Sequence, residues 1–125
     1  MYRRRFPCEP TSVCQARRFT AGVLGSVVPD TTDDIILMVS ELATNACNHG
    51  ATAFEVRVIP PASDACVRVE VVDDAPGKPV LRKPPPSDTH GRGLQIVATL
   101  SDRWGVTRKE KEKCVWFSVA VPPPS

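Results

Sequence analysis

The chain has 125 residues and a formal net charge of only +2, with 16 basic and 14 acidic residues that are largely interspersed. This balance argues against a direct nucleic-acid partner, which normally requires a strongly basic face, and the lack of a long apolar run argues against a membrane span, a membrane partner or a signal peptide. The length predicts one domain over residues 1–125, built around a single core.

The first half of the chain predicts three elements: an edge strand over residues 2–7, a helix from residue 11 to about 27, and a helix over roughly 33–49. For the last of these, Thr31-Thr32 offers a side-chain cap, and Asp33-Asp34 suits the positive end of the helix dipole. Gly50 supplies the left-handed residue that ends a helix. For the first helix, we expect an inner stripe formed by Val13, Ala16, Thr20, Val23 and Val27.

The helix over 33–49 is apolar around much of its circumference. At about 100° per residue, one apolar stripe consists of Ile35, Val39, Leu42 and Ala46. A polar stripe of Glu41, Asn45 and His49 runs along its flank. Taken alone, such a stripe is more often a solvated helix edge than a site, so its interpretation depends on the motifs downstream of this helix.

The second half predicts strands over residues 54–58 and 67–71 with a turn over 60–64, a helix opened by 91–93, and a hairpin whose turn is 110–112 and whose last strand is 114–121. The proline-rich stretch over about 74–90 predicts a functional lid. This order predicts a two-layer α/β (α+β) sandwich, with a mixed, mostly antiparallel sheet covered on one face by three helices.

The chain has an odd number of cysteines, with no CxxC pair and no histidine cluster nearby. They are Cys8, Cys14, Cys47, Cys66 and Cys114. This pattern predicts free thiols in a reducing cytoplasm and argues against a metal site held by cysteine. We expect Cys47, Cys66 and Cys114 to be small core residues.

Three short stretches occur in order: Glu41-x-x-x-Asn45-x-x-x-His49, Asp73-x-Ala75-x-Gly77, and Gly91-x-Gly93-Leu94. Each has an ordinary structural interpretation alone, since the second has good turn chemistry and the third is common in loops. The third also lets backbone amides approach a phosphate at a helix start. The third glycine of a dinucleotide fingerprint and a GxxxxGK[ST] run are both missing, which disfavours Rossmann and P-loop sites.

In this order and spacing, the three stretches resemble the N, G1 and G2 boxes of the histidine-kinase-like ATPases, the Bergerat fold related to gyrase and MutL, over nearly the whole chain. The short lid, the small domain and the run Leu100 to Gly105 resemble the anti-sigma factor serine/threonine kinases abundant in actinobacteria. Two departures stand out: Ala75 replaces the middle glycine of the G1 box, and Pro84-Pro85-Pro86 makes the lid more rigid.

The resemblance implies a role for each matching residue. Asn45 is expected to offer its amide oxygen to Mg²⁺, and Glu41 to act as the general base for a hydroxyl that attacks the γ-phosphate. Asp73 is expected to accept a hydrogen bond from the adenine amino group, selecting ATP over GTP. The remaining nucleotide-binding residues are expected to be His49, Gly77, Gly91, Arg92, Gly93 and Leu94. For His49, a helix-end role stays open.

By resemblance, the function is that of a protein kinase in transcription regulation. It would use ATP and Mg²⁺ to phosphorylate a STAS-domain anti-sigma antagonist, with sequestration of a sigma factor and a homodimer left open. The alternatives are a non-catalytic ATP-dependent partner-switching module and an ATPase whose acceptor is water. Glu41 favours chemistry, because Mg·ATP binding alone needs no base there. A histidine kinase is disfavoured, because no dimerisation helix precedes the domain and the only histidines are His49 and His90.

Overall fold

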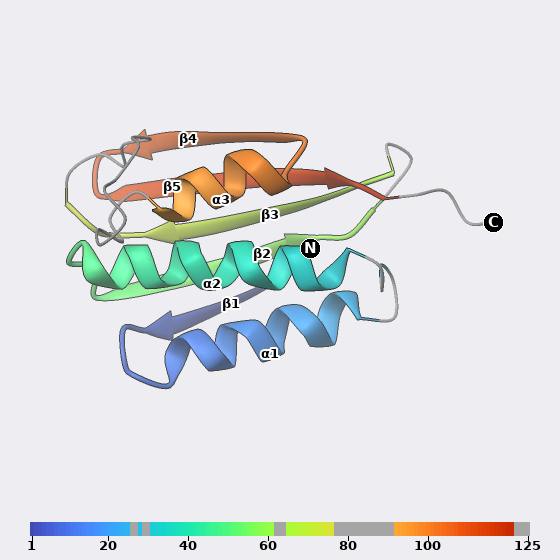
Figure 1. Cartoon of the computed structure of the whole chain (residues 1–125). Helices are drawn as coiled ribbons and strands as arrows, with labels where there is room; N and C mark the ends of the chain where they lie inside the picture. Colours follow the sequence, from blue (N-terminus) through green and yellow to red (C-terminus); the bar gives the residue numbers. More distant parts are fainter. Residues whose placement is uncertain (26–27, 29–30, 62–64, 77–91, 122–125) are drawn as a thin grey trace.

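The computed structural model describes residues 1–25, 28, 31–61, 65–76 and 92–121. Its elements are β1 (Tyr2–Pro7), α1 (Ser12–Leu24), α2 (Thr32–Asn48), β2 (Ala53–Ile59), β3 (Cys66–Asp73), α3 (Arg92–Leu100), β4 (Arg103–Lys109) and β5 (Glu112–Ala120) (Figure 1). The predicted order of elements is confirmed. Most of the predicted lid, from residue 77 onward, and part of the predicted turn, residues 62–64, lie outside the described residues.

The five strands form one sheet in the order β1-β2-β3-β5-β4. All four pairings between the described strands are antiparallel, so the mixed sheet that we expected contains no parallel pair there. The reason lies in the last hairpin: β5 returns between β3 and β4, so β4 becomes an edge strand. The other edge is β1, as predicted.

The three helices cover one face of this sheet and leave the other face open (Figure 1). Alternating side chains of β2, β3 and β5 point toward the helices and are buried: Phe54, Val56, Val58, Val67, Val69, Val71, Val115, Phe117 and Val119. This period-two burial is what the sequence pattern predicted. No helix in the described part of the chain is long and apolar enough to cross a membrane.

Helix α2 contributes the largest share of the helical core. Its buried residues include Ile35, Met38, Val39, Leu42 and Ala46, which confirms the predicted apolar stripe. Gly50 has a φ of 97° and ends the helix as expected. The predicted side-chain cap is wrong: Thr31 makes no capping hydrogen bond, and the Thr32 hydroxyl instead donates backward to the carbonyl of Val28 at 2.7 Å.

Helix α1 ends at Leu24, earlier than predicted, and residues 26–27 and 29–30 lie outside the described residues. Its buried residues are Ser12, Ala16, Thr20 and Leu24. Ala16 and Thr20 were predicted, whereas Val13 and Val23 are only half-buried. The Thr20 hydroxyl donates to the Ala16 carbonyl at 2.9 Å and is thereby satisfied inside the core.

The prediction of free thiols is wrong for two cysteines. Cys8 and Cys47 form a disulfide, with their Cα atoms 5.5 Å apart. The fold brings the residue after β1 beside the last turn of α2, a proximity that a separation of 39 residues does not reveal. Cys66 and Cys114 are also not core residues, because they are half-buried positions on the open face of the sheet. Burial raises the pKa of the Cys114 thiol.

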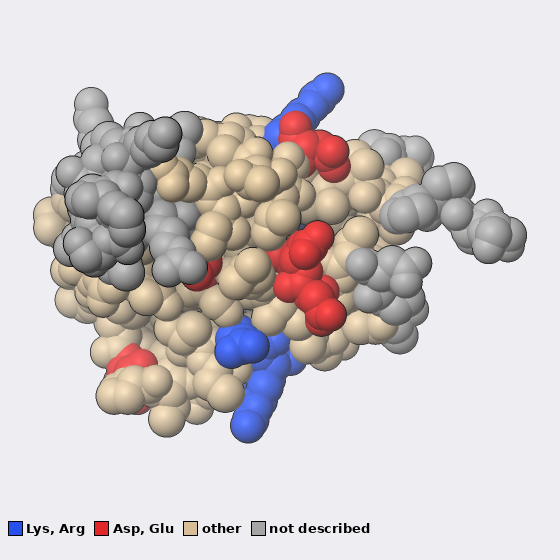
Figure 2. Space-filling view, viewed as in Figure 1, with Lys and Arg blue, Asp and Glu red and all other residues tan. Residues whose placement is uncertain are grey.

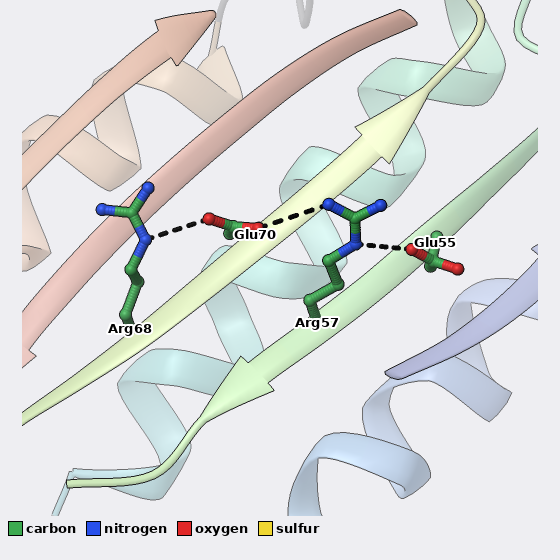
Figure 3. Close-up of polar contacts among 4 residues, drawn as sticks. All are labelled: Glu55, Arg57, Arg68 and Glu70. Atoms are coloured by element: carbon green, nitrogen blue, oxygen red, sulfur yellow. Dashed lines mark hydrogen bonds and ion pairs between the residues drawn. The ribbon is translucent and has the colours of Figure 1, made fainter. Parts of the chain in front are cut away.

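The open face carries a chain of ion pairs across β2 and β3 (Figure 3). Arg57 pairs with Glu55 on its own strand and with Glu70 on the next, and Arg68 donates to Glu70 at 3.0 Å. The hydrogen bond to Glu55 is the main reason that the pKa of Arg57 is raised. The guanidinium of Arg68 also lies 4.2 Å from the ring centre of Trp116. These half-buried charges keep this face polar while remaining paired.

Candidate functional site

The elements that carry the three predicted motifs come together at one end of the molecule. The C-terminal end of α2, the C-terminal end of β3 and the N-terminal end of α3 lie there side by side (Figure 1), and α2 packs against both β3 and α3. This arrangement follows from the topology, because α2 lies across the middle strands and α3 returns the chain to the same face. Gly77 and Gly91 lie outside the described residues.

The polar stripe of α2 lies at the border of the core. Glu41, Asn45 and His49 are each half-buried, whereas Leu42 and Ala46 between them are buried. The backbone carbonyl of Asn45 accepts a hydrogen bond from the backbone N–H of His49 at 2.9 Å. His49 is the C-cap residue of α2, which is the helix-end position that the sequence left open for it. The stripe is therefore neither fully solvated nor part of the apolar core.

Asp73 is the last residue of β3 and is only 5% exposed. The N–H of Ala75 donates to its Oδ1 at 2.7 Å, and Nζ of Lys113 lies 3.5 Å from its Oδ2. The first contact is an Asx-type turn, in which the side chain shapes the backbone that follows. The carboxylate is thus held at the buried end of a central strand, on the same sheet face as the helices.

The loop after Asp73 is anchored on both sides. The carboxylate of Asp74 accepts two hydrogen bonds from Thr52, one of them from the backbone N–H at 2.8 Å. These bonds, the hydroxyl bond first, lower the pKa of Asp74. On the other side, Arg108 of β4 donates to the Ala75 carbonyl at 3.4 Å. The loop therefore has a defined position relative to α2, β2 and β4.

Ala75 occupies the position where the resemblance leads one to expect a glycine. Its side chain is 2% exposed and belongs to the hydrophobic core. Among the described residues other than glycine, only Ala65 and Glu110 have a positive φ, so Ala75 adopts a backbone conformation open to any residue. Alanine therefore fits here because its methyl group packs inward.

The start of α3 completes this end of the molecule. Arg92 and Gly93 are its first two residues, and Leu94 is 4% exposed and anchors the helix to the core. The first amides of a helix have no partner within the helix and form a favourable environment for an anion. Of the predicted site residues, Asn45, His49, Asp73, Arg92, Gly93 and Leu94 belong to the element ends that meet here, and Glu41 lies one turn before Asn45 on α2.

Two residues at this end were missed by the sequence interpretation: Lys113 and Arg108. A signal for Lys113 was present, because period-two alternation places it on the buried face with Val115 and Phe117. No local signal existed for Arg108, whose contact with Ala75 joins residues 33 apart.

The described charges on the helix-covered face are dispersed. On the helix-covered face, the described Lys, Arg, Asp and Glu side chains lie in separate small groups (Figure 2). A cavity of about 180 Å³ lies on the opposite face, where it is lined by Arg57, Glu70, Thr107 and Cys114 among others. That cavity contains none of the predicted site residues, and it belongs to the ion-paired open face.

Comparisons with known proteins agree with this geometry. A family model described as "Histidine kinase-like ATPase domain" matches residues 6–119. The chain is structurally similar to the RsbU and RsbW domains of Rv1364c from Mycobacterium tuberculosis, with a TM-score of 0.72 and 16% identity over 97% of this chain and 32% of that one. The chain thus spans about a third of that relative's length, and this likeness supports the fold. No curated protein matches. The chain belongs to the family of histidine kinase-like ATPase domains.

Proposed function

We propose that this chain binds ATP with Mg²⁺ and acts as a protein serine/threonine kinase of the anti-sigma type. The observation that carries the proposal is the convergence at one end of α2's polar stripe, the buried carboxylate of Asp73 and the start of α3. In a domain of the histidine kinase-like ATPase family, nucleotide binding explains this convergence better than a structural role does, because each element presents a polar group at the border of the core.

Asp73 is the proposed adenine-reading residue. One of its oxygens accepts the Ala75 N–H, while the other is 3.5 Å from Nζ of Lys113 and, as a carboxylate oxygen, can accept more than one hydrogen bond. A carboxylate accepts hydrogen bonds but does not donate them, so it suits the 6-amino group of adenine and rejects the 6-oxo group of guanine. A discriminating hydrogen bond is worth most in a buried site such as this one.

The phosphates and Mg²⁺ are assigned to α2 and α3. Asn45 is the proposed magnesium ligand, since Mg²⁺ takes few protein oxygens and fills its other positions with water and phosphate. Within the described ranges, no group of three or more His, Cys, Asp or Glu could hold a metal by itself. The proposed phosphate-binding residues are Arg92, Gly93 and Leu94. Further candidates for contacts with the nucleotide are His49, Gly77 and Gly91.

Glu41 is the proposed general base, one turn before Asn45. ATP supplies the phosphoryl group that is transferred. Glu41 takes the proton of a Ser or Thr hydroxyl as that oxygen forms a bond to the γ-phosphorus, and ADP leaves with the electrons of the broken P–O bond. Half-burial of Glu41 allows a protein substrate to reach it while bulk water is partly excluded. A site that only binds Mg·ATP needs no carboxylate there.

The proposed protein substrate is a STAS-domain antagonist, with a sigma factor as a second partner and a homodimer as the assembly. These assignments rest on the likeness of the three motifs to anti-sigma kinases. The structural likeness to the RsbU and RsbW domains of Rv1364c, at 16% identity, supports the fold on which this choice rests.

The decisive experiment is phosphoryl transfer from γ-labelled ATP with Mg²⁺ and candidate antagonist proteins, using wild type and Glu41→Ala. A Glu112→Ala variant is the matched control, because Glu112 is an exposed carboxylate at the start of β5. We expect label on the antagonist with wild type and with Glu41→Ala a loss of at least about a hundredfold in rate, with ATP still bound.

Two other results would replace the proposal. Tight ATP binding with neither labelled protein nor released phosphate would establish a non-catalytic partner-switching module. Phosphate release that depends on Glu41 but never labels a protein would establish an ATPase whose acceptor is water.

A further inference from the structure

Lys113 is a lysine buried in the core face of a central strand. It is 3% exposed and precedes Val115, Phe117 and Val119 along the buried side of β5. Lysine is almost never fully buried unless it is paired with an opposite charge. The presence of an ammonium group at this position therefore calls for a specific partner.

That partner is Asp73. The two residues are directly opposite each other in the antiparallel pairing of β3 and β5, and their side chains are 4% and 3% exposed with Nζ and Oδ2 3.5 Å apart. The strands do not need the pair for cohesion, because apolar pairs occupy the next buried positions along the same ladder. A buried ion pair is seldom more stabilising than well-packed apolar side chains of similar volume. Stability alone therefore does not explain the pair.

The charge of Lys113 has a direct chemical consequence for Asp73. A buried carboxylate without a counter-charge is disfavoured in its ionised form and can be relieved by binding a proton. A protonated carboxyl group is both a donor and an acceptor, whereas an ionised one only accepts. Whether the side chain of Asp73 can donate decides which purine it can recognise, because a donor at this position could form a hydrogen bond to a 6-oxo group.

On the basis of the proposed nucleotide site, we propose that Lys113 is a positioning residue that sets purine selectivity. Its ammonium group supplies the counter-charge for the buried carboxylate and orients Oδ2 through the ion pair, while the Ala75 amide holds Oδ1. Asp73 then accepts from a 6-amino purine and rejects a 6-oxo purine. Lys113 acts on the base through Asp73.

The test compares the binding of ATP with that of inosine triphosphate, which differs from ATP in carrying a 6-oxo group. Lys113→Met removes the charge and keeps an unbranched apolar side chain of similar length, and Lys113→Arg keeps the charge. Lys109→Met is the matched control, because it makes the same chemical change at an exposed position of β4. Lys113→Gln serves as a second neutral variant should Lys113→Met fail to fold by circular dichroism.

We expect Lys113→Met to lower the ratio of ATP affinity to inosine triphosphate affinity by about tenfold or more. Lys113→Arg should restore most of the ratio, and Lys109→Met should leave it at the wild-type value. In an Asp73→Asn background, Lys113→Met should cause no further change in the ratio, because the group through which it acts is already gone.

Three results would overturn the inference. Equal weakening of both nucleotides by Lys113→Met and Lys113→Gln would indicate a purely structural pair, and an unchanged ratio in a wild-type-like, ATP-selective protein would remove Lys113 from base recognition. A wild type that binds neither nucleotide would refute the proposed function itself, and this inference with it.

Discussion

Thr52 and Asp74 are joined by two hydrogen bonds, from the backbone N–H and the hydroxyl of Thr52 to the two carboxylate oxygens of Asp74. Thr52 immediately precedes β2, and Asp74 immediately follows β3. The contact therefore fastens the connection from α2 to β2 onto the loop that carries Ala75. Because Asp73 is the neighbour of Asp74, this contact also fixes where the proposed adenine-reading carboxylate lies.

Asp74→Asn should remove a pH-dependent part of the stability. The hydrogen bonds from Thr52 lower the pKa of Asp74 below its ordinary value of 3.8, so its contribution is present at neutral pH and is lost as the pH falls through the lowered pKa. Near neutral pH, we expect the free energy of unfolding of wild type to exceed that of Asp74→Asn by under about 1 kcal/mol, since the site is exposed. Thermal unfolding of both proteins down to acid pH measures this gap, and a gap that widens toward acid would contradict the assignment.

Reduction of the Cys8–Cys47 disulfide should destabilise the fold. The bond joins residues 39 apart and closes a loop that contains α1 and most of α2. Its removal gives the unfolded chain more conformational freedom, which should lower the free energy of unfolding by about 2–4 kcal/mol. Urea unfolding of Cys8→Ser under oxidising conditions measures the loss. The control is Cys14→Ser, because Cys14 is exposed and not disulfide-bonded. Equal midpoints for the two variants would show that the disulfide does not contribute.

Gly105→Ala should be destabilising, whereas Gly22→Ala should not. A Cβ atom at Gly105 would lie 2.7 Å from Nε1 of Trp116, and the guanidinium of Arg68 lies over the Trp116 ring, 4.2 Å from its centre. We expect a loss of about 1–3 kcal/mol from this overpacking. At Gly22, in α1, a Cβ atom would meet nothing within 4 Å, so alanine should gain about 0.5–1 kcal/mol. Denaturant midpoints of the two variants should therefore move in opposite directions.

Asp73→Asn should weaken ATP binding and reduce the preference for ATP over GTP. An asparagine side chain presents an amide donor as well as an acceptor, so the 6-oxo group of guanine is no longer rejected. A lost hydrogen bond to a charged group corresponds to about a tenfold or greater loss in affinity. Titration calorimetry with both nucleotides measures the effect. If affinity and preference both match wild type, the assignment of Asp73 to the base is wrong.

Local sequence patterns were sufficient to predict the elements of this fold. Period-two alternation identified β2 and β3, the helical period identified the buried stripe of α2, and Gly50 marked the end of that helix, because each pattern depends on neighbours within a few residues. The order of the three polar motifs was also readable, since a motif is itself a local feature. Their order along the chain was the basis for expecting a nucleotide site, and the structure brings the described parts of the three motifs to one end of the fold.

Tertiary structure alone decided what depends on residues far apart in the chain. The ladder between β3 and β5 places Lys113 opposite Asp73, and the packing of α2 beside the end of β1 brings Cys47 to Cys8. Ala75 appeared as a departure in the sequence and is a core residue in the fold. The physical reason is common to all three: burial and pairing are set by which strands and helices become neighbours, and local propensity carries no information about that choice.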